Sequence, residues 1–219
     1  MSFKVLAFDS STETLSVALG LAGATKDFCF RQTAGGNRAS QVILPIIQEL
    51  MAQAQWRFTD LDAIAFGCGP GAFTGVRVAC SVAQGLGFAS ETPVLPINTL
   101  LAVAQTAYMR VGYAQIMAAL DARMGEVYTA SYDFRQLRAP WAAKAKLVCR
   151  HDCVVPSGYI QAGNMGGIAC LPEASSMLCL ARPLLQMGFA IPAEESRPLY
   201  IRNKIAQTMA ERLHQKTGA

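Results

Sequence analysis

A glycine-rich stretch is the clearest candidate for a binding site in this 219-residue sequence. It runs from Gly67 to Arg77, between the apolar run 64–66 and a segment of helical character. It includes Gly69, Pro70, Gly71 and Thr74. Thr74 is a suitable N-cap for the following helix, and bare backbone at a helix N-terminus can bind an anion. No Gly-Lys-Ser/Thr closes the stretch, which excludes a Walker A loop, and the dinucleotide-binding spacing fits only if it is forced.

An acidic residue followed by hydroxyls forms a second candidate site. Asp9 ends the predicted strand 3–9 and is followed by Ser10, Ser11 and Thr12. This order resembles the first phosphate-binding turn of the actin, hexokinase and sugar-kinase superfamily. Ser and Thr are also ordinary turn residues, the turn lacks glycine, and Glu13 would repel a phosphate. We therefore interpret it as at most a vestigial phosphate turn.

Soft metal ligands gather in one segment near residue 150. Cys149, His151 and Cys153 would face one way if their segment were extended, as a zinc site requires. They supply at most three ligands and no Cys-x-x-Cys pair, and a Cys-His nucleophile pair drawn from them has no third group to orient it. We interpret them as surface or core residues of an irregular segment and expect no metal site.

Strand and helix signals predict two lobes of α/β class. In the first lobe we expect strands at 3–9, 15–21, 27–32, 61–66 and 94–97, a helix after Ser40 with Pro45 in it, and helices at 76–89 and 98–108. In the second we expect the hairpin 116–132, short strands at 147–149 and 158–162, and a helix at 174–187. The predicted domains are 1–110 and 111–219, with a tail from about residue 198 crossing back to the first lobe.

Small residues recur every fourth position in the helix after the glycine turn. They are Gly75, Ala79, Ala83 and Gly87. Positions i and i+4 share a helix face, so one side of this helix is nearly bare. The stripe lies either on the chain's own sheet or against a helix of another subunit.

Composition and charge restrict the class of protein. The chain is 52% hydrophobic and 16% charged, which suits a soluble protein with part of its surface covered by a partner. No run is long enough for a membrane span and the start is no signal peptide, so we expect a cytoplasmic protein. Seven scattered cysteines indicate reduced thiols. The net charge of +4 is dispersed and does not indicate direct RNA binding.

Five motifs together resemble the bacterial TsaB (YeaZ) family. They are Phe8-Asp9-Ser10-Ser11-Thr12-Glu13, residues 69–77, Ala83-Gln84-Gly85-Leu86, residues 121–128 and Tyr200-Ile201-Arg202-Asn203. The fourth motif is a hairpin turn that contains Asp121, Arg123, Gly125 and Glu126. The resemblance is nearly continuous over 4–132, is poor over 134–197 and resumes near Pro198.

The resemblance implies a two-lobed fold of the actin and sugar-kinase type and a role in making threonylcarbamoyladenosine in tRNA. It implies a non-catalytic subunit that binds a TsaD-type catalytic paralogue, is joined by a TsaE-type ATPase and forms a homodimer in isolation. ATP, ADP and metal would belong to the partners, and tRNA would be met only through the complex. The small-residue helix and the helix with Pro45, including Ile43 and Ile47, would form the partner face.

Two departures and two alternatives remain. Ala39 stands where many members have His, and the poorly matched middle is short. An ATP-dependent sugar or acyl kinase is supported only by superfamily analogy, and phosphoryl transfer needs phosphate cradles in both lobes. A metallopeptidase would need histidines at helical spacing, whereas the two histidines, His151 and His214, lie far apart.

Overall fold

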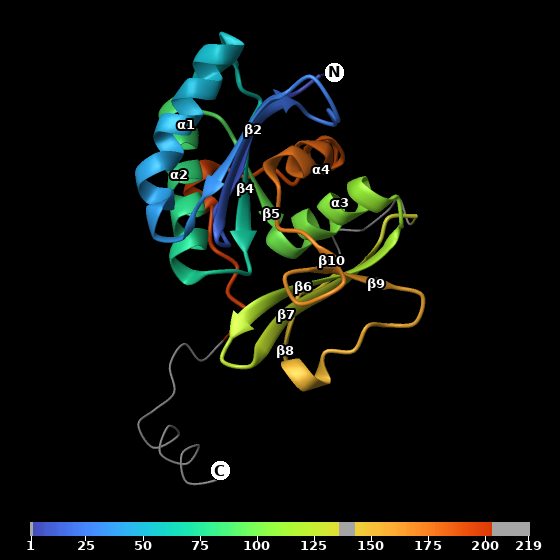
Figure 1. Cartoon of the computed structure of the whole chain (residues 1–219). Helices are drawn as coiled ribbons and strands as arrows, with labels where there is room; N and C mark the ends of the chain where they lie inside the picture. Colours follow the sequence, from blue (N-terminus) through green and yellow to red (C-terminus); the bar gives the residue numbers. More distant parts are fainter. Residues whose placement is uncertain (1, 136–142, 203–219) are drawn as a thin grey trace, which may run out of the picture.

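Two mixed sheets carry the fold in this computed structural model, which describes residues 2–135 and 143–202 (Figure 1). The first sheet has the order β3-β2-β1-β4-β5. Its strands are β1 (Lys4–Asp9), β2 (Thr14–Leu21), β3 (Cys29–Ala34), β4 (Ala63–Gly69) and β5 (Val94–Asn98). The second has the order β10-β9-β6-β7-β8. Its strands are β6 (Gln115–Arg123), β7 (Glu126–Asp133), β8 (Lys146–Cys149), β9 (Ile160–Gly163) and β10 (Ile168–Ala169).

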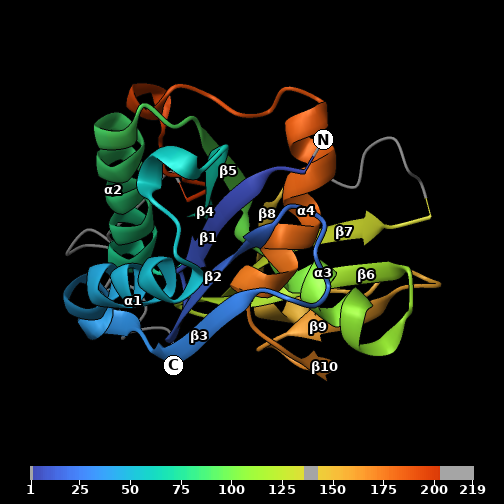
Figure 2. The same ribbon diagram turned by 90° about the horizontal axis from the view of Figure 1, so that it is seen from above.

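Within residues 2–135 and 143–202, four α-helices cover the first sheet and fill the space between the sheets. They are α1 (Ala39–Ala54), α2 (Phe73–Ser90), α3 (Thr99–Val111) and α4 (Ala174–Gln186). Helices α1 and α2 lie on one face of the first sheet and α4 lies on the other (Figure 2). Short 3-10 turns connect the elements, among them η1 (Gly36–Arg38), η4 (Arg150–Asp152) and η5 (Ala193–Glu195). Among the described helices, none has both the length and the apolar character that crossing a membrane requires.

The alternation of side chains along β1 explains the layers. Leu6 and Phe8 enter the core beneath α1 and α2, whereas Val5 and Ala7 enter the core that contains α3 and α4. Successive side chains of a strand point to opposite faces, so a strand buried on both faces must be apolar throughout. The first three strands form an antiparallel meander, and β4 and β5 add to it in parallel.

One hydrophobic core joins the two lobes. It contains Leu95 of the first sheet, Val103 of α3 and Leu120 and Tyr132 of the second sheet, all nearly inaccessible to solvent. The outer face of the second sheet is thinner, because Met117, Ala119 and Val127 are covered mainly by side chains of β8 and the segment after it. The lobes are therefore two sheets packed about a shared helical layer.

The expected N-cap Thr74 does not cap its helix, and Ser40, after which a helix was expected, lies inside α1. Helix α1 begins at Ala39 and contains Pro45, and its start continues the turn η1, where the Ala39 N–H donates to the Gly36 carbonyl. Helix α2 is preceded by Ala72, whose N–H donates to the Ser11 carbonyl over 2.7 Å. In both cases a preceding turn anchors the helix start, so a side-chain cap is not what sets it.

The chain returns to the first lobe earlier than residue 198. Helix α4 packs on β1 and β2, and the Gly23 N–H donates to the Leu178 carbonyl over 2.7 Å. Ile191 then forms an antiparallel bridge with Val94 at the edge of β5. The segment after Pro198 thus begins on the first lobe and runs toward the second, the reverse of the expected direction, because the apolar face of α4 is needed to cover the first sheet.

Candidate functional site

A cleft of about 490 Å³ lies between the two lobes. The first lobe contributes Ser11, Thr12 and the glycine turn at Pro70 and Gly71, and the second contributes the hairpin of β6 and β7. The strap, which we define as residues 199–202, closes one side. The volume of the cleft falls within the range of small-molecule sites. Sequence motifs that are far apart in the chain therefore meet at one place.

The glycine turn packs directly on the turn after β1. A Cβ atom placed on Gly75 would lie 1.8 Å from the Ser10 carbonyl oxygen, and one placed on Gly67 would lie 1.8 Å from an Asp9 carboxylate oxygen. The Ser10 hydroxyl donates to the Gly75 carbonyl over 2.8 Å. Only glycine permits this approach, because any larger residue would overlap these atoms. The turn residues are thus engaged within the protein.

Asp9 is buried and is held by hydrogen bonds from its own turn. Its Oδ1 accepts from the Ser11 N–H at 2.8 Å and from the Ser11 hydroxyl at 2.7 Å, and its Oδ2 accepts from the Thr99 hydroxyl at 3.4 Å. Burial raises the pKa of Asp9 to about 6, against the lowering effect of these hydrogen bonds. Asp9 and Ser10 do not line the cleft, whereas Ser11 and Thr12 do. That Asp9, Ser10, Ser11 and Thr12 form a vestigial phosphate turn stays a prediction.

The hairpin of β6 and β7 turns tightly at the cleft. Arg123, Met124 and Gly125 all have positive φ, and the Asp121 carboxylate accepts from the Arg123 N–H at 2.8 Å and pairs with its guanidinium at 3.3 Å. Asn164, which sequence reasoning did not single out, accepts from the Asp121 N–H at 2.9 Å. In the sequence, Asn164 is closely followed by Gly166 and Gly167, a pattern that indicates a turn and no particular function.

The strap ties the two lobes together. The Leu199 N–H donates to the Cys68 carbonyl over 2.7 Å, and Arg202 forms an ion pair with Glu126 and donates to the Ala122 carbonyl. The family resemblance included both the hairpin motif and the motif at 200–203, but it did not indicate that the two are in contact. The structure shows that Glu126 of the hairpin is the direct partner of Arg202. Asn203 lies outside the described residues.

Arg77 stands between two aromatic rings at the start of α2. Its guanidinium lies 3.7 Å from the Phe73 ring centroid and 5.8 Å from that of Tyr200, and its Nε donates to the Tyr200 hydroxyl over 2.8 Å. Such cation–π contacts are worth about 0.5–1 kcal/mol at exposed sites. Arg77 thus holds the strap against α2. Thr74, the expected cap, is exposed.

The small-residue stripe lies on the chain's own first lobe. Gly75, Ala79, Ala83 and Gly87 are all buried. A Cβ on Gly87 would lie 2.8 Å from the Thr92 carbonyl oxygen, and Ala79 and Ala83 belong to the core beneath α1 and α2. Ile43 and Ile47 are fully buried in the same core. The expectation that these six residues form a partner surface is wrong, because the sheet already occupies the space beside them.

The opposite face of these helices is exposed and carries large apolar side chains. Phe73 and Phe88 on α2 are 45% and 77% exposed, and Leu44 on α1 is 44% exposed. Of these three, Phe73 lies at the cleft, against Arg77 and Tyr200, so Phe88 and Leu44 are the ones exposed away from it. Periodicity alone did not identify this face, because the glycine and alanine stripe was the stronger pattern.

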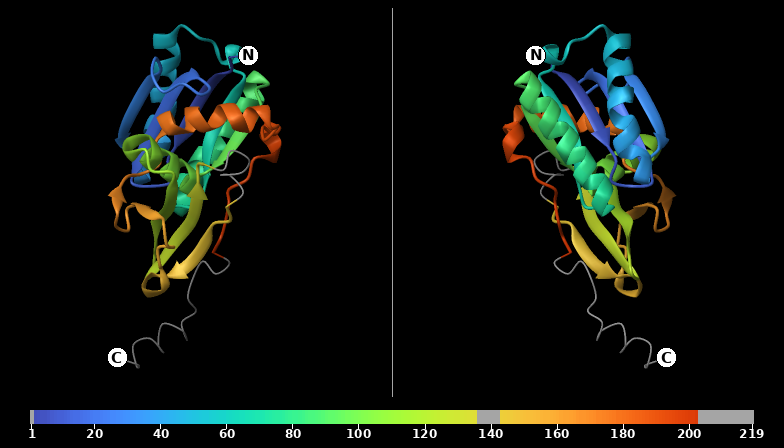
Figure 3. Two further views of the ribbon diagram at one scale, coloured as in Figure 1. Left: turned by 90° about the vertical axis from the view of Figure 1, so that its right-hand side faces the viewer. Right: turned by 90° about the vertical axis from the view of Figure 1, so that its left-hand side faces the viewer.

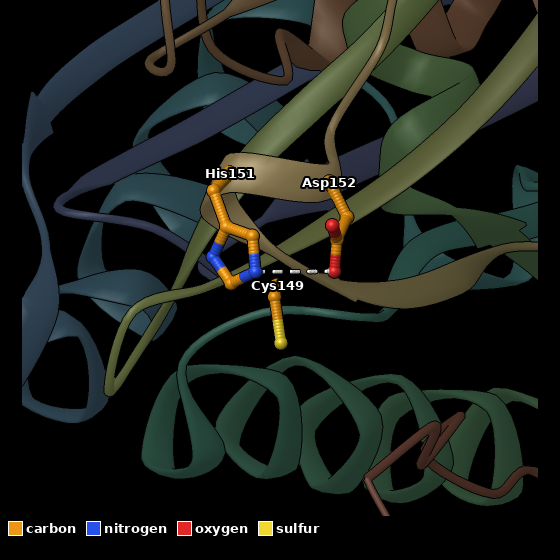
Figure 4. Close-up of side chains that lie close together, drawn as sticks. All are labelled: Cys149, His151 and Asp152. Carbon is orange, nitrogen blue, oxygen red and sulfur yellow. Dashed lines mark ion pairs between the residues drawn. The ribbon is translucent and has the colours of Figure 1, made fainter.

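The turn η4 lies between Cys149 and Cys153, two of the three residues that were considered as zinc ligands. Cys149 and His151 are exposed, whereas Cys153 is partly buried and packs with the core of the second sheet's outer face. Asp152 takes its place near the other two (Figure 4). This placement agrees with the interpretation of Cys149, His151 and Cys153 as surface or core residues of an irregular segment, and Asp152 was not singled out from the sequence.

Comparisons with known proteins agree with the fold and the motifs. The family model described as TsaD, tRNA N6-adenosine threonylcarbamoyltransferase, matches residues 35–150. The tRNA threonylcarbamoyladenosine biosynthesis protein TsaB of Escherichia coli is 33% identical, covering 93% of this chain and 96% of its own length. This chain belongs to the TsaB (YeaZ) family. The TsaB protein of Haemophilus influenzae is 32% identical, covering 92% of this chain and 94% of its own length.

Solved structures agree with the family and with its two-lobed fold of the actin and sugar-kinase type. YeaZ from Pseudomonas aeruginosa is 34% identical, with a TM-score of 0.82 over 90% of this chain and 99% of its own. In this TsaB family member, the glycine turn, the hairpin and the strap, which carried the resemblance, all line the same cleft.

Proposed function

We propose that this chain is a non-catalytic subunit in the biosynthesis of tRNA threonylcarbamoyladenosine, which binds and supports a TsaD-type paralogue. The observation that carries the proposal is the exposure of Leu44 on α1 and Phe88 on α2. Both helices face the viewer in the right-hand view of Figure 3. Apolar side chains this exposed mark a surface for a protein partner. The names of the relatives support the pathway.

The engagement of the candidate catalytic groups supports a non-catalytic role. Asp9, Ser10 and Ser11 use their side chains to fasten β1 to α2 and α3, so these groups are committed to the fold. Helix α1 carries no histidine, and a His-x-x-x-His pair is what a metal-binding catalytic helix of this superfamily branch requires. In this proposal the metal, ATP and ADP are used by the partners.

The proposal extends to the assembly. A TsaE-type ATPase joins the pair, tRNA is met through the complex, and the same face supports a homodimer when the chain is alone in the cytoplasm. A face shared by self-association and by a paralogue is reasonable, because a paralogue presents related helices. Homodimer and heterodimer would then compete for α1 and α2.

The docking face is tested by charging its exposed phenylalanine, Phe88. Phe88→Glu should weaken association with the co-expressed TsaD-type paralogue by about tenfold or more, because a central aromatic anchor commonly contributes more than 1 kcal/mol. Val154→Glu is the matched control, since Val154 is also 77% exposed but lies in the second lobe. Association is measured by calorimetry or sedimentation.

Both variants should keep the melting temperature of the wild type, because exposed substitutions rarely change stability by more than about 0.5 kcal/mol. Wild-type affinity of Phe88→Glu, or an equal loss in Val154→Glu, would show that the face is wrongly assigned.

A further inference from the structure

The turn after β8 brings three metal-ligand side chains together at the surface. The ligand atoms of Cys149, His151 and Asp152 all lie within 4.8 Å of one another, and the His151 Nε2 is 3.4 Å from an Asp152 carboxylate oxygen. Figure 4 shows the three side chains projecting from the same side of η4. Among the described residues, these three form the one cluster of His, Cys, Asp or Glu side chains that could hold a metal ion.

The backbone that carries these side chains is anchored on both sides. Cys149 is paired with Glu126 in the β7–β8 ladder, and the Arg150 N–H donates to the Gly125 carbonyl over 2.8 Å. Cys153 packs inward against the second sheet. The intervening Arg150 directs its guanidinium to the sulfur of Met165, at 4.0 Å. The ligand positions are therefore set by the fold, and only side-chain rotation is needed to adjust them.

The donor set matches a borderline-soft cation. A thiolate, an imidazole and a carboxylate are the ligands that Zn²⁺ takes in proteins, with bonds of about 2.0–2.3 Å, whereas Mg²⁺ and Ca²⁺ prefer oxygen alone. The thiolate and the carboxylate offset both positive charges. Of the seven cysteines, all of which the structure describes, Cys149 alone is exposed, so its sulfur is open to an incoming ion.

We propose that Cys149, His151 and Asp152 bind one Zn²⁺ ion at the surface of the second lobe, with a fourth position left to water. Drawing the donors together to tetrahedral spacing needs movements of about 1 Å by exposed side chains. The proposal departs from the expectation of a metal-free subunit, because the turn supplies Asp152 where the sequence pattern had pointed to Cys153. It does not depend on the proposed docking face.

Zn²⁺ binding is measured on the full chain, freed of metal and kept reduced, by competition with a chromophoric chelator. We expect one ion per chain, and about tenfold weaker binding or worse in each of Cys149→Ser, His151→Asn and Asp152→Asn, because each removes one of three protein ligands. With Co²⁺ as the probe, the near-ultraviolet thiolate absorption should disappear in Cys149→Ser.

Two matched controls locate the site. Cys153→Ser changes the neighbouring thiol, and His214→Asn changes the second of the two histidines in the sequence; both should bind Zn²⁺ as the wild type does. The proposal is wrong if the wild type shows no saturable binding, if Cys149→Ser or His151→Asn binds normally, or if His214→Asn abolishes binding. Unchanged melting temperatures in the three ligand variants verify that they are folded.

Discussion

Single atoms decide how the glycine turn meets the turn after β1. The Ser10 carbonyl fills the space beside Gly75. Ser10 also begins the turn that connects β1 to β2. The Ser10 backbone cannot move away from Gly75 easily, because the Ser10 hydroxyl donates a hydrogen bond to the Gly75 carbonyl. The contact is therefore a fixed joint between β1 and α2.

We expect opposite effects from alanine at two glycines of the same helix. Gly75→Ala should lower the free energy of unfolding by about 1–3 kcal/mol, because its Cβ must enter an occupied contact. Gly85→Ala should raise it by about 0.5–1 kcal/mol, since nothing lies within 4 Å of that Cβ and alanine is the better helix former. Urea unfolding of both variants measures the difference, and equal effects would contradict the packing described.

Asp9 makes stability depend on pH. Its folded pKa of about 6 lies above the ordinary value of 3.8, so the folded protein binds the proton more tightly than the unfolded chain. This contribution is fully present below about pH 4 and is lost as pH rises through 6. Two pKa units correspond to roughly 3 kcal/mol.

Asp9→Asn should abolish this dependence, because the amide keeps an oxygen for Ser11 and carries no charge to desolvate. Between pH 4 and 7 the wild type should therefore lose about 3 kcal/mol of stability relative to the variant. Urea titrations at both pH values give the comparison. Parallel profiles for the two proteins would show that Asp9 is ionised at no cost.

At the scale of the element, α2 has two faces with different tasks. The small-residue face lets the helix lie close to the sheet, and Phe88 is exposed on the outward side. A bare stripe permits close packing against any surface, so its sequence does not say which surface that is. The first lobe's own sheet is the nearer partner and occupies it.

Ala83→Leu should therefore destabilise the chain itself. Ala83 is fully buried in the core beneath α1 and α2, and overpacking such a site typically costs about 1–3 kcal/mol. Thermal unfolding of the isolated protein at a concentration where it is monomeric measures this loss. A wild-type melting temperature combined with weakened partner binding would return the stripe to the interface.

At the scale of the whole molecule, the lobes share one core and are joined again by the strap through Arg202 and Glu126. In the proposed function, α1 and α2 are the elements of the first lobe that meet the partner.

Loss of the protein should deplete threonylcarbamoyladenosine from tRNA while other modified nucleosides persist, because only the TsaD-type partner would lose its support. Nucleoside analysis of tRNA from a deletion strain measures the outcome, and re-expression of the wild-type chain is the control. An unchanged level in a genome without a second member of the family would remove the proposed function.

The strands, the helices and the α/β class follow from the sequence, because local periodicity determines which segments are strands or helices and which side chains must be buried. The motifs of the glycine turn and the hairpin likewise indicated the family before any coordinates. These features depend on residues that are neighbours in the chain, so the sequence alone is enough to identify them.

Which surface each face meets was decided by tertiary structure alone. The sequence could not show that α4 returns to the first sheet, that Gly75 faces Ser10, or that Asp152 and not Cys153 joins His151. The physical reason is that close approach depends on the volumes and directions of residues far apart in the chain. A pattern of small or polar residues records that a contact is made, and only the packed molecule identifies the partner.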